Sequence, residues 1–149
     1  MKYKSILILT VICLALALLV GCAADVTAAK SIVGKFWSGW RDLKKATILN
    51  TLADKVTYEV EFIGFPVSST LNAEEIADTF TDPNKYWGGC TDRAFVISKT
   101  TEYPESKLII VESQASWMED GDQVKYNLHF TLSKINSRWR ITKVKHILI

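Results

Sequence analysis

The segment QVKYNLHFTLSKI, from Gln123 to Ile135, alternates between polar and apolar side chains. Its apolar positions, two residues apart, are Val124, Tyr126, Leu128, Phe130 and Leu132. Because the side chains of a strand point alternately to its two faces, this pattern predicts a long strand with one buried face. A chain that contains such a strand has to supply neighbouring strands and an apolar layer that covers the buried face.

Three more segments in the second half of the chain have the character of long strands. They read RAFVISKTTEY (93–103), SKLIIVESQASWM (106–118) and RWRITKVKHILI (138–149). Pro104, the sequence EDGD at 119–122 and Asn136-Ser137 are turn signals between them. Strands joined by short turns form an antiparallel meander, so we expect one antiparallel sheet. An earlier alternating segment, KVTYEVEF (55–62), predicts a further strand that GFPVSST (64–70) interrupts.

The first half of the chain supplies the helices that cover this sheet. Between Ala28 and Asn50 the apolar residues recur at spacings of three and four, which predicts a helix with one apolar stripe. The stripe consists of Ile32, Val33, Phe36, Trp37 and Trp40. A second helix is predicted over 44–52 with Asp42 as its cap, and a third over LNAEEIADTF (71–80) with Asn72 as its cap. The predicted fold class is α+β, with N-terminal helices packed on a curved antiparallel sheet.

The N-terminal segment MKYKSILILTVICLALALLVGC reads as a targeting sequence. Two lysines precede an apolar run over 6–20, which is short for a membrane-spanning helix and typical of a secretory signal. Leu19-Val20-Gly21-Cys22 resembles a bacterial lipobox. That resemblance implies cleavage before Cys22 and its acylation, and the alternative is an uncleaved anchor helix that continues through Ala24. We therefore predict a signal peptide over 1–21, an acylated Cys22 with a tether over 22–29, and a domain over 30–149.

Charge and cysteine content narrow the classes of partner. The chain has 18 Lys and Arg against 16 Asp and Glu, and the predicted cleavage removes two lysines, which leaves a neutral domain. A neutral exported domain argues against a nucleic-acid partner. Cys90 would be the one cysteine besides Cys22, so no internal disulfide is expected, and it is either a reactive thiol or a small buried side chain. Two distant histidines and one cysteine lack zinc-ligand spacing, and we expect neither a metal nor a cofactor.

The order of the predicted elements resembles the nuclear transport factor 2-like, cystatin-like fold. The resemblance is carried by FWSGWRDLKKATILNTLADKVTYEV and VKYNLHFTLSKINSRWRITKVKHI, the latter with Trp139-Arg140-Ile141 after a polar turn, and it covers Ala28 to Ile149. It implies a cone-shaped domain that encloses a pocket. This superfamily includes ketosteroid isomerase-like and SnoaL-like enzymes, and also exported lipoproteins and secretion-system components, so the fold leaves the function open.

Candidate site residues follow from these patterns. Five aromatic side chains are predicted to line the pocket: Trp37, Trp40, Tyr58, Phe62 and Tyr126. Four others are predicted to form an exposed partner surface: Trp87, Trp117, Arg138 and Arg140. The segment from Lys134 to Ile149 carries five basic residues and no acidic one. It either faces anionic lipid headgroups or an acidic partner, or is only the solvated face of the sheet. His129 is expected on the outer face of the sheet, whereas the face of His146 stays unassigned.

These observations are compatible with three hypotheses of function. The first is a non-catalytic domain, anchored by its lipid at the cell envelope, that binds a partner protein or a small apolar ligand. The second is a structural component of a secretion or conjugation assembly. The third is a SnoaL-like or isomerase-like enzyme that uses Tyr58 and Asp42. The membrane is expected to be the outer one in a Gram-negative cell, by analogy from Ala23-Ala24, and a homodimer through the sheet is an open possibility.

Overall fold

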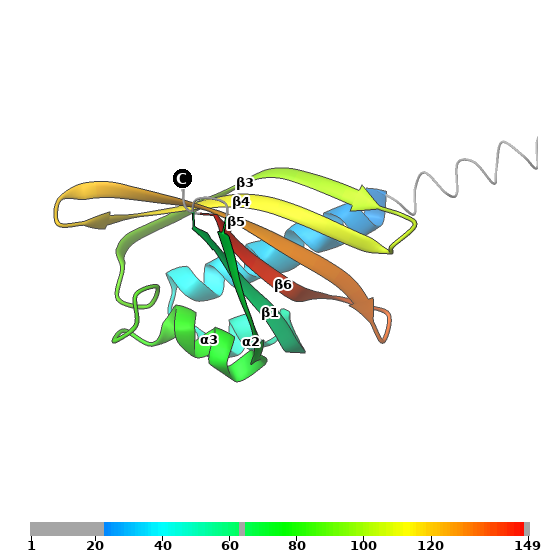
Figure 1. Cartoon of the computed structure of the whole chain (residues 1–149), viewed down its shortest axis with the longest axis horizontal. Coiled ribbons are helices and arrows are strands. Elements are labelled where there is room, and N and C mark those ends of the chain that lie inside the picture. The colour runs from blue at the N-terminus through cyan, green and yellow to red at the C-terminus, as the bar shows by residue number, and fades with distance from the viewer. Residues whose placement is uncertain (1–22, 63–64, 148–149) are drawn as a thin grey trace, which may run out of the picture.

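The computed structural model describes residues 23–62 and 65–147, without the side chains of Phe62 and Phe65 (Figure 1). The predicted signal peptide and the acylation of Cys22 lie outside the described residues, and both stay predictions. Among the helices that are described, none has the length and apolar character of a membrane span.

A long N-terminal helix packs along one face of the sheet and is described over residues 23–41 (Figure 1). Its stripe is buried as predicted, with Val33, Phe36, Trp37 and Trp40 at 0 % exposure. The helix differs from the prediction at both ends. The predicted tether over 22–29 is helical from residue 23, and Ala29 is already fully buried. The packed domain therefore begins close to residue 22.

The second helix is shorter than predicted. Helix α2 spans Lys45–Leu49, and Leu52 already begins strand β1. Its N-cap is Lys44, whose side chain makes no capping hydrogen bond. The prediction that Asp42 caps this helix is wrong, because the Asp42 carboxylate instead accepts a hydrogen bond from Arg41 Nε at 3.0 Å. The turn is compact because Gly39 lies against Ile48, where a methyl group would come within 2.8 Å of Ile48 Cγ1.

Six strands form one sheet in the order β2-β1-β6-β5-β4-β3. Their bounds are β1 Leu52–Phe62, β2 Phe65–Asn72, β3 Thr91–Tyr103, β4 Leu108–Glu119, β5 Asp122–Ile135 and β6 Arg138–Ile147. The meander from β3 to β6 is antiparallel, as predicted. The wholly antiparallel sheet is a wrong prediction, because β1 pairs with β6 in parallel. Periodicity within a strand carries no information about which distant strand lies beside it.

Strand β2 is an addition that the sequence analysis missed. The segment read as a break pairs with β1 in antiparallel register, with Val60 opposite Val67. Pro66 lies within β2, which is an edge strand, and proline is tolerated there because one side of the strand needs no ladder hydrogen bonds. Residues 66–70 are all exposed, so the apolar alternation of a buried strand is absent.

The third helix and the tight turns follow the prediction closely. Helix α3, Ala73–Thr81, begins with a reciprocal capping box in which Asn72 Oδ1 accepts from Glu75 N at 2.9 Å and Glu75 Oε2 accepts from Asn72 N at 2.8 Å. The β4–β5 turn contains Asp120 and Gly121 at positive φ, and the β5–β6 turn contains two residues at positive φ, Asn136 and Ser137.

The helices cover one face of the sheet and leave the other face to solvent (Figure 1). On β4 the buried positions alternate and are Ile109, Val111, Ser113, Ala115 and Trp117. The outer face carries cross-strand ion pairs such as Lys143 Nζ to Glu59 Oε2 at 2.7 Å. Residue 129 pairs with residue 112 of β4 between buried neighbours on β5, so His129 lies on the outer face as predicted.

The arrangement of the helices and strands gives the fold two distinct ends (Figure 1). We call proximal the end where the first turns of the N-terminal helix lie beside the β3–β4 turn (104–107) and the β5–β6 turn (136–137). We call distal the opposite end, which carries the loop 82–90 and the β4–β5 turn (120–121). The N-terminal helix runs from the proximal end toward the distal end.

Candidate functional site

Aromatic side chains from the loop 82–90 and from strands β4 and β5 gather at the distal end. Trp117 stacks on Tyr126 with ring centroids 4.9 Å apart and planes 15° apart. The Trp87 ring contacts both rings of this stack, with its centroid 5.1 Å from that of Trp117 and 5.8 Å from that of Tyr126. We call these three rings the aromatic floor. Its members come from segments distant in sequence, so only the fold brings them together.

The loop that supplies Trp87 is held by two close contacts. The Trp40 indole N–H donates to the carbonyl oxygen of Trp87 at 2.7 Å. At Gly88 a methyl group would come within 2.0 Å of the Asp82 carbonyl oxygen, so no other residue fits without backbone movement. The loop therefore folds over the core, and the prediction that Trp87 and Trp117 are exposed is wrong, because they are 3 % and 2 % exposed.

A hollow of about 430 Å³ opens to solvent beside the aromatic floor. We call it the distal hollow, and its lining consists of Pro83, Asn84, Lys85, Tyr86, Gly89, Cys90, Thr91, Trp117, Met118, Glu119 and Asp120. Tyr86 and Met118 are 49 % and 37 % exposed at its rim. The Tyr86 hydroxyl lies 2.8 Å from the Tyr126 hydroxyl, which fixes the rim to the floor. Tyr86 was not predicted, because a loop carries no periodic signal for the direction of its side chains.

His146 lies behind the aromatic floor and is 6 % exposed. Its ring packs against Tyr126 at 4.6 Å and Trp87 at 5.2 Å between centroids. Among the described residues Nε2 has no hydrogen-bond partner. Burial lowers the pKa of His146 to about 4, so the imidazole is neutral at pH 7. Val144 and His146 are two residues apart and share the inward face of β6, which is a signal that the sequence contains. The irregular register of β6 after Ile141 obscured that signal.

Tyr58 points inward from β1 as predicted, and it packs against the core. Burial raises its pKa. The hypothetical pair of Tyr58 with Asp42 is not assembled, because Asp42 lies exposed in the turn after the N-terminal helix and pairs with Arg41. The predicted pocket residues Trp37 and Trp40 are fully buried core residues. The prediction for Phe62 falls on a side chain outside the described part.

The predicted partner surface is divided between the two ends of the fold. Arg138 and Arg140 lie at the proximal end, where Arg138 is exposed and the half-buried Arg140 donates to the carbonyl oxygen of Asn50. Trp87 belongs to the loop 82–90 and Trp117 to the last residues of β4, so both lie buried at the distal end. One surface that contains all four residues, as the prediction had it, is therefore not formed.

Cys90 lines the distal hollow but its thiol is not activated. The side chain is half-buried, and Sγ donates to the Tyr86 carbonyl oxygen at 3.0 Å. Burial raises its pKa to about 11, so the thiolate is scarce at neutral pH. No group of three or more His, Cys, Asp or Glu side chains in the described residues is placed to share a metal ion.

Three ionisable side chains at the aromatic floor, Tyr58, Tyr86 and His146, are neutral near pH 7. Burial and the Tyr126 hydroxyl raise the pKa of Tyr86, and burial raises the pKa of Tyr58 and lowers that of His146. General acid–base catalysis works best with a group whose pKa lies near the working pH. The arrangement is suited to hydrogen bonding and to apolar contact.

Comparisons with solved structures identify the fold. An NTF2-like protein with a cystatin-like fold from Novosphingobium aromaticivorans matches with a TM-score of 0.69 at 12 % identity, over 90 % of this chain and 88 % of that one. An NTF-2 like protein of unknown function from Silicibacter pomeroyi matches with a TM-score of 0.62 at 12 % identity, over 84 % and 96 % of the two chains. A LEH-like epoxide hydrolase of M. tuberculosis matches at 0.58 and 16 % identity, over 84 % and 81 %.

The chain matches no protein-family model, and no curated protein matches it in sequence. At identities this low the structural likeness concerns the fold alone. The chain has the nuclear transport factor 2-like α+β fold, with N-terminal helices on a six-stranded mixed sheet. The solved structures with this fold include proteins described as of unknown function and one described as a hydrolase.

Proposed function

We propose that this protein is a bacterial lipoprotein anchored through Cys22, whose domain binds a partner protein at the cell envelope without catalysing a reaction. The single observation that carries the proposal is the distal hollow, with Tyr86 and Met118 exposed at its rim above a rigid aromatic floor. Exposed aromatic residues and methionine on a well-packed base are typical of protein-binding hot spots.

The position of the hollow supports an envelope role. The hollow is lined by the loop 82–90 and the β4–β5 turn, which lie at the distal end, whereas the described N-terminal helix starts at the proximal end (Figure 1). The proposed anchor precedes that helix start. The helix described over residues 23–41 has a length of about 27 Å at 1.5 Å per residue. An anchor at Cys22 would therefore hold the hollow away from the membrane surface, where a second envelope protein has access to it.

The charges around the hollow indicate what kind of partner fits. Glu119 and Asp120 line it beside Lys85, and Asp122 follows in the next strand. A partner that inserts an apolar side chain between Tyr86 and Met118 and places a basic residue near Glu119 would match both features. Burial lowers the pKa of His146 to about 4 and raises the pKa of Tyr58, so both move away from the near-neutral pKa that suits general acid–base catalysis, which supports binding.

A small apolar ligand remains a second candidate because of one observation. His146 Nε2 is buried beside aromatic rings with no hydrogen-bond partner among the described residues. A ligand with one hydroxyl or N–H group would satisfy this acceptor, since buried polar atoms are ordinarily paired. A shift of the His146 imidazole resonances on addition of such a ligand, which His129 would not share, would favour this candidate.

The anchor is tested by replacing Cys22 with alanine. We expect the Cys22→Ala protein to accumulate at its uncleaved mass and without the lipid, because neither acylation nor the cleavage that depends on it can occur. The intact masses of the variant and of the wild-type protein measure this. Cys13→Ala, a change inside the signal segment, is the matched control and should be processed normally. A mature wild-type protein that still begins at Met1 would contradict the lipoprotein proposal.

Partner binding is tested with a photo-crosslinking amino acid at position 118 in living cells. We expect a covalent adduct of defined mass, and we expect Tyr86→Ala to reduce its yield by about tenfold or more, which is the cost of a modest hot spot. Tyr86 is half-exposed, so the substitution spares the core. The same crosslinker at Tyr103, which is 45 % exposed at the proximal end, is the control. Adducts of equal yield at both positions would refute a specific distal site.

A further inference from the structure

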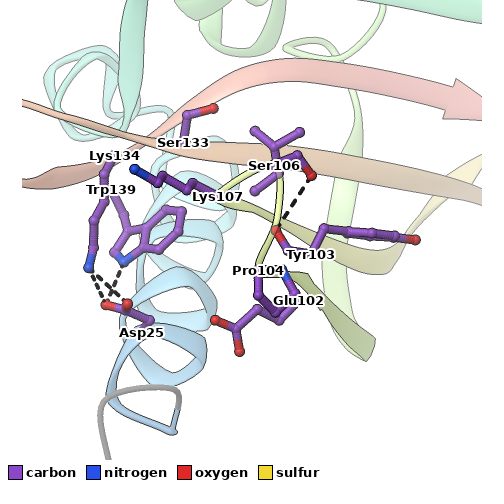
Figure 2. Close-up of a pocket in the computed structure, with 10 residues that line it drawn as sticks. Asp25, Glu102, Tyr103, Pro104, Ser106, Lys107, Ser133, Lys134 and Trp139 are labelled. Carbon is purple, nitrogen blue, oxygen red and sulfur yellow. Dashed lines mark hydrogen bonds and ion pairs between the residues drawn. The ribbon is translucent and has the colours of Figure 1, made fainter. Parts of the chain in front are cut away.

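The first turns of the N-terminal helix are held by the β5–β6 hairpin at the proximal end, and they line a pocket together with the β3–β4 turn. Lys134 Nζ lies 2.8 Å from the Asp25 carboxylate, and the Trp139 indole N–H donates to the same carboxylate at 3.1 Å. These bonds hold the pKa of Asp25 below its usual range, the lysine contributing most. Figure 2 shows Asp25 on the helix beneath Lys134 and Trp139, beside a pocket of about 430 Å³.

This clamp fixes how far the domain can lie from an N-terminal anchor. Consecutive Cα atoms are about 3.8 Å apart, so residue 22 lies within that distance of the first described helical residue. A membrane attachment at residue 22 therefore brings the surface around Asp25 within about one Debye length, roughly 10 Å, of the lipid headgroups. The same distance applies to a lipid on Cys22 and to an uncleaved anchor helix.

The charged side chains of the domain are distributed unequally between its proximal and distal ends. The pockets around the helix start contain five cations, namely Lys35, Lys107, Lys134, Arg138 and Arg140, against three acids, Asp25, Glu102 and Glu105. The loop 82–93 and the residues around the β4–β5 turn have the opposite balance, with Asp82, Asp92, Glu119, Asp120 and Asp122 against Lys85, Arg93 and Lys125. A domain without net charge is thus basic at the end that faces the anchor.

Exposed apolar side chains lie on the same two hairpins. Tyr103 is 45 % exposed next to the β3–β4 turn, and Ile135 is 41 % exposed next to the β5–β6 turn. Tyrosine is enriched where one end of its side chain meets lipid and the other meets water. Figure 2 shows the Tyr103 ring extending away from the pocket and the Lys107 ammonium reaching back across it.

We propose that the proximal end docks on an anionic phospholipid surface, with Lys107 and Arg138 among the headgroups and the distal hollow directed away from the membrane. The inference rests on the proposed function only for the membrane attachment that precedes residue 23. It adds a second attraction to the anchor and fixes the orientation of the domain. Each cation near an anionic surface raises the ratio of docked to undocked domain about fivefold.

Hydrogen exchange on the full-length acylated protein tests this orientation. The protein is reconstituted into vesicles of phosphatidylcholine and into vesicles of equimolar phosphatidylglycerol and phosphatidylcholine. We expect amides of 103–107 and 135–138 to exchange several-fold more slowly in the anionic vesicles, and amides of 119–122 to exchange equally in both. Raising the salt concentration should remove the difference, since surface attraction is screened.

Variants in which basic residues are replaced by acidic ones provide a second test of the docking. Lys107→Glu combined with Arg138→Glu should lower the docked-to-undocked ratio by about 25-fold or more, at fivefold for each cation, and abolish the slow exchange. Lys134 is left intact because it holds Asp25. Lys85→Glu combined with Lys125→Glu, two exposed cations nearer the distal end, is the matched control and should leave the protection unchanged.

The outcomes separate this inference from the proposed function. The mass of the N-terminal peptide is measured on the same sample. A protein without the lipid overturns the anchor proposal, whereas an acylated protein whose proximal turns exchange equally in both vesicles overturns the docking. Slow exchange at 119–122 in place of the proximal turns would also overturn it, because it would indicate the opposite orientation. The wild-type comparison between the two lipids needs no variant, so a misfolded variant cannot obscure the result.

Discussion

Replacement of Trp37 by alanine is expected to lower the free energy of unfolding by about 3–5 kcal/mol. The ring is fully buried and contacts aromatic side chains from every layer of the fold. It stacks on Phe95 of β3 at 6.0 Å and meets Phe130 of β5 at 5.5 Å between centroids, and Phe80 of α3 lies at 6.4 Å. Its removal leaves a cavity between the helices and the sheet that this rigid cluster can fill only in part. Urea denaturation followed by circular dichroism measures the change.

Trp37→Phe is the matched control for this prediction. Phenylalanine retains most of the apolar contact but loses the indole N–H, which donates to Ser113 Oγ at 3.0 Å. Ser113 keeps a longer hydrogen bond to the Leu128 carbonyl oxygen at 3.4 Å, so we expect a smaller loss, of about 1–2 kcal/mol. Equal losses for the two variants would mean that the hydrogen bond, and not the packing, makes Trp37 important.

Acid is expected to destabilise the domain through His146. Burial lowers its pKa from 6.5 to about 4, so the unfolded chain binds a proton at a higher pH than the folded one. Above pH 6.5 the imidazole is neutral in both states and the stability is fully present. As the pH falls from 6.5 toward 4 the unfolded state gains a proton first, and about 3 kcal/mol is lost across this window. Below pH 4 this contribution no longer changes.

The measurement is the urea midpoint between pH 7.5 and 4. His146→Gln should flatten the dependence in the window from 6.5 to 4, because glutamine does not titrate, although the substitution itself lowers the stability at every pH. His129→Gln is the control, since His129 lies on the outer face of the sheet, and it should keep the slope of the wild-type protein. A wild-type slope that persists in His146→Gln would show that another group is responsible.

Local signals predicted much of the architecture. The alternation in β5 identified its buried face correctly, and the turn residues placed the β4–β5 and β5–β6 hairpins within a residue or two. The N-cap of α3 was predicted correctly at Asn72. Each of these features depends on neighbours a few residues away, so the amino-acid sequence carries the whole of the relevant information.

Pairings over long distances were not predicted. The parallel contact of β1 with β6 joins residues such as Tyr58 and Val144, and the edge strand β2 lacks any periodic apolar signal. The tether prediction failed for the same reason, because Asp25 belongs to the domain only through Lys134 and Trp139, more than a hundred residues later. No local pattern at Asp25 distinguishes a clamped residue from a free one.

The residues of the candidate site likewise fall into those that local patterns placed correctly and those that only the tertiary structure placed. Strand alternation alone placed Tyr58 and Tyr126 inside the fold. The burial of Trp87 and the exposure of Tyr86 were settled by the path of the loop 82–90, which the Trp40 indole and the close approach at Gly88 hold in place. A loop has no period, so the face that each of its side chains presents depends on what it packs against. The amino-acid sequence thus sufficed for the periodic elements, and the acylation of Cys22 stays a prediction from the sequence alone. The distal hollow and the basic proximal end arose only when distant segments packed together, because their residues come from separate parts of the chain.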